Sequence, residues 1–516
     1  MKKSNNWTDK IDLTFLCLFV ATFICLILAT FNKGIYMDEK EHLYSTIQIL
    51  NGQIPYRDFF QHHHPLLWYA FAPIAYFFQE TANIIYVARF FIFGCTLITC
   101  LYLYNIARLL TLSKWLSVCG IILYLTNEIV VSKGIDFRPD NPMVMFFIGG
   151  IYYLLKYIDN QKKNSLIISF VFFVISFLFL QKALLILFPV GLLCVYLMIK
   201  KKISIFDFLI AGTFSLIVLL LFFLFFYSQG SFKDYFELNW LLNIKTGKLN
   251  PYAASLYERT FFIVVGSISV LLLCLLKKKQ NILLKYFNFI TSVILVFLCI
   301  FPTPWEQYWL PLYPLISVVM IAVFSQLLSE KIFKLMVCVC ALPIIFHVFY
   351  MYSNSSPLKG NMRLIQYVLD NTTPEDYVLD EYTFNLQRKN AVGYYWFGRH
   401  NIGLTDMREF NRHPVPDLNK ILIEKKPVFI SIQPWINWYQ IKRYPYSEEK
   451  LVELMQHADL DFQYSIRRGW FYKKYEELKT FPIIQRLDKE YINKYYVEIT
   501  ENVYMRKDRA VRANPY

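Results

Sequence analysis

The chain has 516 residues, of which 56% are hydrophobic, 18% are aromatic and only 18% are charged, and its mean hydropathy is +0.36. This composition excludes an ordinary soluble protein and indicates an integral membrane protein. The net charge of +15 does not indicate nucleic-acid binding, because the tail from Asn354 holds 25 Lys/Arg against 21 Asp/Glu and most of the excess therefore lies in the apolar part.

Apolar segments recur along the first two thirds of the chain. A bilayer core of about 30 Å requires roughly 20 apolar residues per helix. Such segments lie at 12–32, 84–107, 115–132, 142–157, 165–181, 183–199, 205–227, 260–276, 286–302, 308–328 and 332–352. They predict a polytopic α-helical membrane domain over residues 1–353 with about 11 transmembrane helices.

Basic residues occupy every second gap between these segments. They are Lys2, Lys3 and Lys10; Arg108 and Lys114; Lys156, Lys162 and Lys163; Lys200 to Lys202; Lys277 to Lys279 and Lys285; and Lys331 and Lys334. The positive-inside rule therefore places the N-terminus in the cytoplasm and the tail outside. The first segment lacks a convincing cleavage site, and we interpret it as an uncleaved anchor.

This topology predicts outer loops at 33–82, 133–141, 228–259 and 303–307, with a tight turn at Lys182. Within the first loop, the run Leu66 to Phe78 is hydrophobic with aromatic edges. It predicts interfacial helices that lie along the bilayer surface.

The tail, residues 354–516, has the mixed pattern of a soluble domain. We predict helices at 362–372 and 415–426 and strands at 376–382, 427–433 and 494–505. Alternating helices and strands indicate one small α/β or α+β domain on the outer side of the membrane.

The first candidate site residues follow the first apolar segment. Asp38 and Glu39 stand where water meets lipid headgroups, and a partly desolvated carboxylate there has the chemistry of a general base. The alternative is that residues 38–41 form a solvated helix end. Spacing alone leaves both interpretations open.

Further along the same loop, Tyr56, Arg57 and Asp58 combine a basic group with an aromatic and an acid. Arg57 either binds a phosphate through its planar guanidinium or interacts with lipid headgroups. The run His62-His63-His64-Pro65 suggests a metal, but three consecutive imidazoles cannot all face one ion from a regular element. A divalent metal is therefore possible but not favoured, and hydrogen bonding to a substrate is preferred.

Three other outer segments carry candidates. The loop at 133–141 holds Asp136, Arg138 and Asp140 beside apolar helices. Lys182 stands alone between two apolar segments, either extending to the membrane surface or meeting an anion. Glu306 and Tyr308 lie in an aromatic segment that suits a sugar-sized cleft or an aromatic belt. No nucleotide, haem or zinc-protease motif occurs, so no cofactor is assigned.

These motifs resemble the GT-C membrane glycosyltransferases, specifically the family 39 group of protein O-mannosyltransferases and aminoarabinose lipid A transferases. The likeness covers about residues 10–350. It rests on Asp38-Glu39, the G-x-x-P-Y-R-D-F run from Gly52 to Phe59, His64-Pro65-Leu66, Arg138-Pro139-Asp140, Gln181-Lys182 and the W-L-P-L-Y-P run from Trp309 to Pro314. The histidine triplet is richer than the family pattern, so His62 and His63 receive no role from it.

The resemblance implies inverting transfer of a sugar from a polyprenyl-phosphate donor at the periplasmic face of a bacterial inner membrane. It implies Asp38 as the base with Glu39 as its helper, and Arg57, Arg138 and Lys182 as partners of the donor phosphate. The substrate cleft would be lined by Tyr56, Asp58, His64, Asp136, Asp140, Glu306 and Tyr308. The acceptor is a protein, a lipid or a glycan.

Two other activities fit a chain of this kind. One is a transporter or flippase of a lipid-linked glycan precursor, which would place polar groups across the bilayer midplane. The other is a glycan ligase or polymerase. Because the candidate polar groups gather at the outer boundary, the sequence favours the transferase.

Overall fold

The computed structural model describes residues 12–244, 261–276, 281–300, 306–380, 384–396, 413, 417–431 and 487–510. Several predictions concern residues outside these ranges: the N-terminal lysines, much of the loop at 228–259, Lys277 to Lys279, the segment 303–305 and parts of the tail. The side chain of Glu306 also lies outside the described part.

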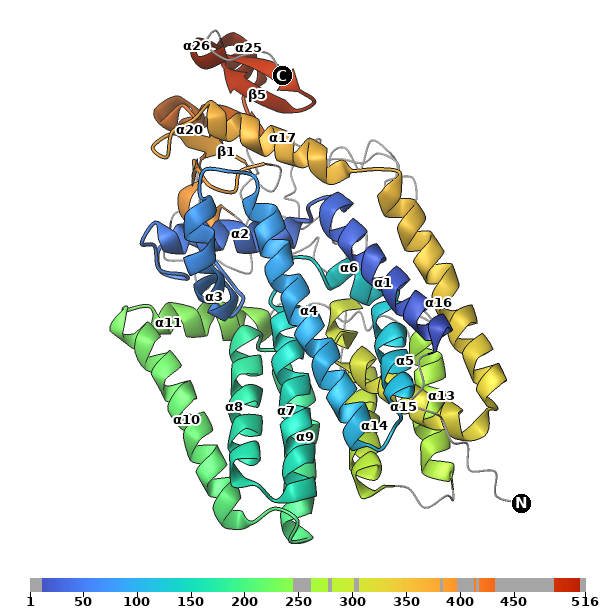
Figure 1. The fold of residues 1–516 in the computed structure, drawn as a ribbon. Coiled ribbons are helices and arrows are strands. Elements are labelled where there is room, and N and C mark those ends of the chain that lie inside the picture. The colour runs from blue at the N-terminus through green and yellow to red at the C-terminus, as the bar shows by residue number, and fades with distance from the viewer. Residues whose placement is uncertain are drawn as a thin grey trace, which may run out of the picture.

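The apolar helices form the larger part of the molecule (Figure 1). They are α1 (Leu13–Asn32), α4 (Ile84–Leu109), α5 (Lys114–Leu125), α6 (Glu128–Lys133), α7 (Asp140–Asn160), α8 (Lys163–Phe179), α9 (Ala183–Ile199), α10 (Ile205–Ser228), α13 (Phe261–Leu275), α14 (Ile282–Ile300), α15 (Leu312–Leu327) and α16 (Glu330–Ser353). Among the described residues, five helical segments are long and apolar enough to cross a membrane, and several shorter apolar helices accompany them. The count of eleven spans stays a prediction.

One predicted span is broken in two. The apolar segment at 115–132 forms α5 and the short α6, because Asn127 interrupts it. The Asn127 side chain accepts hydrogen bonds from the backbone N–H groups of Ile129 (3.0 Å) and Val130 (3.3 Å), which caps a new helix. The break turns the chain toward the loop that carries Arg138.

The helices pack closely where small residues face a neighbour. A side chain at Gly150 of α7 would place its Cβ 2.3 Å from the ring of Phe173 on α8. The Ser169 and Ser176 hydroxyls of α8 donate to the carbonyls of Gly150 and Met143, each at 2.8 Å. Small residues and hydroxyls at helix contacts are typical of membrane proteins, because they allow close approach of the backbones.

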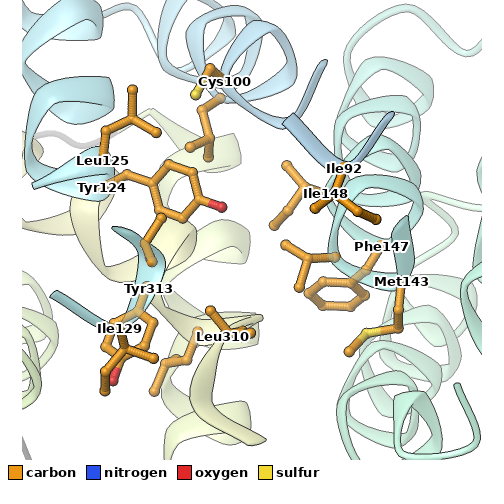
Figure 2. Close-up of a cluster of buried hydrophobic side chains, with 14 of the residues drawn as sticks. Ile92, Cys100, Tyr124, Leu125, Ile129, Met143, Phe147, Ile148, Leu310 and Tyr313 are labelled. Carbon is orange, nitrogen blue, oxygen red and sulfur yellow. The ribbon is translucent and has the colours of Figure 1, made fainter. Parts of the chain in front are cut away.

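The centre of the helical part is a continuous apolar core. Figure 2 shows a portion of it, in which Ile92 of α4 and side chains from α7 lie on one side. Side chains from α5, α6 and the start of α15 lie on the other, together with Leu310 just before α15 and Cys100 of α4. The residues labelled there are Ile92, Cys100, Tyr124, Leu125, Ile129, Met143, Phe147, Ile148, Leu310 and Tyr313, all buried. This core fixes the helix ends between which the candidate site lies.

The loop at 33–82 contains two helices, α2 (Met37–Leu50) and α3 (Leu66–Ala75), followed by the single turn η1 (Tyr76–Phe78). The predicted helix in the run Leu66 to Phe78 is thus confirmed, and its placement along a bilayer surface stays a prediction. Residues 38–41 are not a solvated helix end, since Glu39 and Glu41 are buried at the start of α2. Burial of α2 follows from its position between the apolar helices and the C-terminal part (Figure 1).

Among its described residues, the C-terminal part contains α17 (Pro357–Asp370), α20 (Leu418–Lys425), α25 (Lys489–Tyr495), α26 (Lys507–Ala510) and five short strands. The strands are β1 (Tyr377–Leu379), β2 (Lys389–Asn390), β3 (Phe429–Ser431), β4 (Tyr496–Thr500) and β5 (Val503–Arg506). They form one sheet in the order β2-β1-β3-β5-β4, in which β1 is parallel to β2 and β3, and β5 is antiparallel to β3 and β4.

The predicted tail helices and strands therefore occur, with one correction. The segment 494–505 is the end of α25 followed by a β-hairpin, not one strand. The hairpin turns at Glu501 and Asn502, and Asn502 has φ +61°. Asparagine tolerates this left-handed conformation better than other side chains, which makes it a turn signal within the run.

Partly buried polar contacts join the C-terminal part to the first loop. Arg388 donates to both carboxylate oxygens of Glu80 (3.0 and 2.7 Å), to the Thr372 hydroxyl (2.9 Å) and to the Leu369 carbonyl (3.2 Å). The amide of Gln387 donates to the Thr81 carbonyl at 3.0 Å. The end of the first loop is thus held by the tail.

A second contact lies closer to α2. The rings of Tyr44 on α2 and Trp396 are 4.0 Å apart between centroids, and the Tyr44 hydroxyl accepts the backbone N–H of Asn390 at 3.2 Å. The Phe60 N–H donates to the Tyr394 carbonyl at 3.0 Å. The C-terminal sheet therefore covers the side of the first loop that faces away from the apolar helices.

Replacing Arg388 by Ala should loosen this junction. The change removes a buried guanidinium and leaves its carbonyl partners without a donor, at a cost of about 2 kcal/mol or more. Thermal unfolding and limited proteolysis of the detergent-solubilised protein would measure the loss. The matched control is Lys389→Ala, because Lys389 forms an exposed ion pair with Glu375 and its loss should cost less than about 0.5 kcal/mol. Equal stability of the two variants would contradict the prediction.

Candidate functional site

The site begins at the first turn of α2. Four residues after the end of α1, the chain starts a new helix whose first turn holds Asp38 and Glu39. Unpaired N–H groups and the helix dipole favour negative charge at that end. The two neighbouring carboxylates nevertheless have different environments, because successive residues of a helix point in different directions.

Asp38 forms an ion pair with Arg138, whose Nε also donates to Oδ2 of Asp140 at 3.1 Å. The exposed fraction of the side chain is 23% for Asp38, 5% for Arg138 and 2% for Asp140. Asp38 is therefore the member of this group that reaches solvent. Arg138 and Asp140 are the buried members of the group. Oδ1 of Asp140 has no hydrogen-bond partner among the described residues.

Glu39 points into the protein and pairs with Arg89 of α4. Arg89 donates to both Glu39 oxygens at 2.8 Å, and both side chains are fully buried. The same guanidinium donates to the carbonyls of Thr30 (3.1 Å), Lys33 (2.7 Å) and Gly34 (3.1 Å). This one side chain thus joins the end of α1, the following link, α2 and α4.

Asp136 forms an ion pair with Lys33, which lies in the link between α1 and α2. The Lys33 Nζ lies 2.5 Å from Oδ1 of Asp136 and also donates to the carbonyl of Ser132. Burial lowers the pKa of Lys33, and the carboxylate of Asp136 offsets part of that effect. The pair fastens the loop after α6 to the link that precedes Asp38.

The three consecutive histidines make different contacts, although the rings of His62 and His63 lie 4.0 Å apart between centroids. The ring of His62 stacks against Phe60, that of His64 lies against Tyr235 with its Nε2 3.2 Å from the tyrosine hydroxyl, and Nε2 of His63 lies 3.8 Å from Oε1 of Glu41. Burial lowers the pKa of His62 and His64 to about 3 and that of His63 well below its usual value. Neutral imidazoles, each in a different environment, surround the start of α3.

Tyr56 shapes the turn that leads to these histidines. It adopts φ +70°, a conformation that costs a bulky residue energy, and its side chain is fully buried. Its hydroxyl donates to the His63 carbonyl at 2.5 Å, and its carbonyl accepts the Tyr394 hydroxyl at 2.7 Å. Tyr56 therefore holds the backbone of the histidine run and meets the C-terminal part.

Arg57 and Asp58 lie at the surface and bind each other. The Arg57 guanidinium donates to both Asp58 oxygens at 2.8 and 2.9 Å and to the Gln229 carbonyl at 2.8 Å. Asp58 also accepts the Ile54 N–H at 2.8 Å. The structure thus places these two side chains in a turn that contacts the end of α10, rather than with Asp38 and Arg138.

Lys182 lies at the start of α9 with its Nζ 4.1 Å from the ring centre of Tyr308, in a cation–π contact. Its charge lowers the pKa of His42, His62 and His63. Lys182 is therefore close to the histidines of the first loop. The structure thus brings Lys182 and Tyr308 together, and Glu306 is the first residue of the same short helix, η4 (Glu306–Trp309). The roles expected for these residues stay predictions.

Four residues of this region were missed in the sequence: Lys33, Arg89, His42 and Trp68. Arg89 had a usable signal, because an arginine within an apolar helix is expensive and requires a partner. Lys33 followed the first apolar segment directly and resembled a flanking charge. His42 and Trp68 had no signal, since their contact joins two helices separated by a loop.

Comparisons with known proteins agree with this architecture. Residues 63–227 match the family model described as dolichyl-phosphate-mannose-protein mannosyltransferase. That segment includes Arg138 and Lys182 but not Asp38, and it is less than half of the chain. No curated protein matches the chain in sequence.

Solved structures resemble most of the chain. ArnT from Cupriavidus metallidurans bound to undecaprenyl phosphate has a TM-score of 0.56 at 11% identity, covering 85% of this chain and 94% of that one. Its apo form gives 0.53 at 11% identity, covering 80% and 91%. The apo oligosaccharyltransferase of Archaeoglobus fulgidus gives 0.50 at 11% identity, covering 90% and 71%. At such identity the likeness shows the fold, which is the predicted one.

Replacing Arg89 by Met should destabilise the protein strongly. The change leaves the Glu39 carboxylate buried without its cation, which costs about 3–5 kcal/mol. The double variant Arg89→Met/Glu39→Met should recover most of this loss, because it removes both charges. Thermal unfolding in detergent measures each variant, with Arg57→Met as the exposed control. The prediction fails if the single variant is as stable as the double variant.

Proposed function

We propose that this chain, which has the GT-C fold of the family 39 glycosyltransferases, moves a sugar from a polyprenyl-phosphate donor to an acceptor at the periplasmic face of a bacterial inner membrane. The fold likeness to ArnT and the mannosyltransferase family match over residues 63–227 support glycosyl transfer. The ArnT structure contains undecaprenyl phosphate, which supports a donor of that chemical class.

The observation that carries the proposal is the position of Asp38. Its carboxylate is the partly exposed member of the group formed with Arg138 and Asp140, at the N-terminus of a helix that contains further ionisable groups. The guanidinium of Arg138 holds this carboxylate in place, and a carboxylate oxygen can accept a proton. A base in this setting is oriented by its contact with Arg138, and its exposed part can reach an acceptor.

The reaction assigned to this site is a single displacement with inversion. Asp38 accepts the proton of the acceptor hydroxyl, the hydroxyl oxygen forms a bond to the anomeric carbon of the sugar, and the bond from that carbon to the phosphate oxygen breaks. The electron pair of the broken bond leaves with polyprenyl phosphate as an anion. A fixed cation near the phosphate lowers the barrier, because negative charge grows there in the transition state.

The surrounding contacts favour positioning roles for several predicted site residues. Arg138 binds Asp38 and Asp140 and is proposed to orient the base, so that a contact with the donor phosphate is secondary. Glu39 uses both oxygens on Arg89 and is proposed to fix the start of α2. Asp136 is proposed to do the same through Lys33. These roles keep Asp38 at a constant place relative to α4 and α7.

Lys182 is the proposed cation for the donor phosphate. It lies at the start of α9, within electrostatic reach of the first-loop histidines and of Asp140, and its Nζ contacts the face of Tyr308. An aromatic face stabilises an ammonium without neutralising it. Lys182 is therefore available to an anionic ligand.

Replacing Asp38 by Asn should abolish transfer while the protein remains folded. Asparagine has nearly the same shape and cannot accept the proton. Mass spectrometry of envelope lipids, glycans and proteins from cells with the wild type or the variant measures transfer, and thermal unfolding in detergent measures folding. The control is Glu375→Gln, since that side chain is 82% exposed in the C-terminal part. Full product in the Asp38→Asn cells would remove the proposed base and favour a flippase.

Replacing Lys182 by Ala should weaken binding of undecaprenyl phosphate about tenfold, equivalent to about 1.4 kcal/mol for the loss of one charged contact. Native mass spectrometry or a thermal-shift titration with undecaprenyl phosphate itself gives the affinity. The matched control is Lys201→Ala, beyond the opposite end of α9, which should bind as the wild type does. An unchanged affinity in Lys182→Ala would assign the phosphate to other side chains.

A further inference from the structure

His42 is a buried side chain one helical turn after Asp38. Positions separated by four residues lie on the same face of a helix, so His42 follows Asp38 along the face of α2 that carries the proposed base. His42 is 1% exposed. The proposed mechanism does not use this residue.

Trp68 fixes the tautomer of His42. The indole Nε1–H of Trp68 on α3 lies 3.0 Å from Nδ1 of His42. An indole nitrogen only donates hydrogen bonds, so Nδ1 is the acceptor and carries no proton. In the neutral ring the proton is then on Nε2, which faces away from Trp68. Burial supports the neutral form, because it lowers the pKa of His42 to about 3, with Lys182 lowering it further and Asp140 opposing.

The carboxylates near this N–H group do not take its hydrogen bond. Oε1 of Glu41 and Oδ1 of Asp140 are both buried without a hydrogen-bond partner among the described residues. Asp140 is near enough for its charge to raise the pKa of His42. Arg138 joins Asp140 to Asp38, which lies one helical turn before His42 on the same face of α2. Oδ1 of Asp140 is thus an acceptor without a described donor in the part of the site that His42 faces.

A metal ion is the competing explanation for this cluster. Glu41, His42 and His63 offer ligand atoms within 4.8 Å of one another. A histidine that binds a metal through Nε2 normally donates its Nδ1–H to an acceptor. Here the indole N–H of Trp68 points at Nδ1. A proton on Nδ1 would place two N–H donors against each other. The contact with Trp68 therefore disfavours His42 as a metal ligand.

We propose that the Nε2–H of His42 and Oδ1 of Asp140 together bind one hydroxyl of the transferred sugar. The hydroxyl oxygen accepts from His42, and its proton is donated to Asp140. A hydroxyl satisfies both groups because it accepts and donates through one oxygen. An ammonium cannot accept from His42, and a phosphate or carboxylate oxygen would be repelled by Asp140. This inference rests on the proposed glycosyl transfer and adds a specificity determinant to it.

Trp68 is a positioning residue in this scheme, because it acts through His42. A direct test is the ¹⁵N NMR spectrum of protein labelled at histidine, with the His42 signals assigned by their loss in His42→Gln. The wild type should show a protonated Nε2 and an unprotonated Nδ1. Trp68→Phe should shift the ring toward the other tautomer, since it removes the donor. A protonated Nδ1 in the wild type would overturn the inference.

Recognition of the sugar hydroxyl is tested with sugar donors. A panel of undecaprenyl-phosphate hexoses identifies one that the wild type uses, and its monodeoxy analogues are then compared with it. One analogue should lose on the order of 100-fold in kcat/KM with the wild type, because the buried partners are left unpaired. With the His42→Phe variant, the kcat/KM values of the same analogue and of its parent donor should differ by less than about threefold. His42→Gln, which retains an N–H donor, should keep most of the discrimination.

The outcomes separate the two hypotheses. If the wild type transfers no hexose and no envelope product depends on it, the proposed function fails. If it transfers a hexose but His42→Phe discriminates as the wild type does, only the inference fails. It also fails if His42→Phe weakens binding of bare undecaprenyl phosphate as Lys182→Ala does, which would make His42 a phosphate contact. Stoichiometric zinc in the wild type that His42→Gln loses would establish the metal instead.

Discussion

The buried ion pair between Glu39 and Arg89 is the interaction on which the candidate site depends. Arg89 reaches from α4 to both oxygens of Glu39 and to three carbonyls at the end of α1 and in the link that follows. A guanidinium buried in an apolar helix is stable only when its donors are satisfied in this way. Satisfying them fixes where α2 starts, and the start of α2 fixes Asp38. The proposed base thus derives its position from its neighbour in the chain.

The charged residues around this point divide into closed and open groups. Glu39 with Arg89, and Asp136 with Lys33, are pairs whose members serve each other. Asp38 with Arg138 and Asp140 has two carboxylates for one guanidinium, and its outermost carboxylate reaches solvent. A closed pair holds the backbone in place, whereas an open group has a carboxylate that can still react with a ligand. This difference supports assigning the proton transfer to Asp38.

The first loop is enclosed between the apolar helices and the C-terminal sheet. Contacts of Tyr44 with Trp396 and of Tyr56 with Tyr394 connect α2 and the histidine run to the tail. Burial on both sides keeps the histidines neutral and leaves hydrogen bonding as their means of recognition. A neutral ring whose tautomer is set by Trp68 can distinguish donors from acceptors, which a charged imidazolium cannot.

The sequence by itself determined the apolar helices, the helix from Leu66, the α/β character of the tail and the candidates Asp38, Arg138, Asp140 and Lys182, because these follow from local periodicity and from charges beside apolar segments. It left residues 38–41 as a possible solvated end, since burial by a distant domain is not visible in composition. It placed 494–505 as one strand, although Asn502 is a local turn signal within that run. Which acid pairs with which cation was decided by tertiary structure alone: Arg89 meets Glu39 across 50 residues and Arg138 meets Asp38 across 100. Such pairing depends on helix packing, and the chain carries no local signal for it.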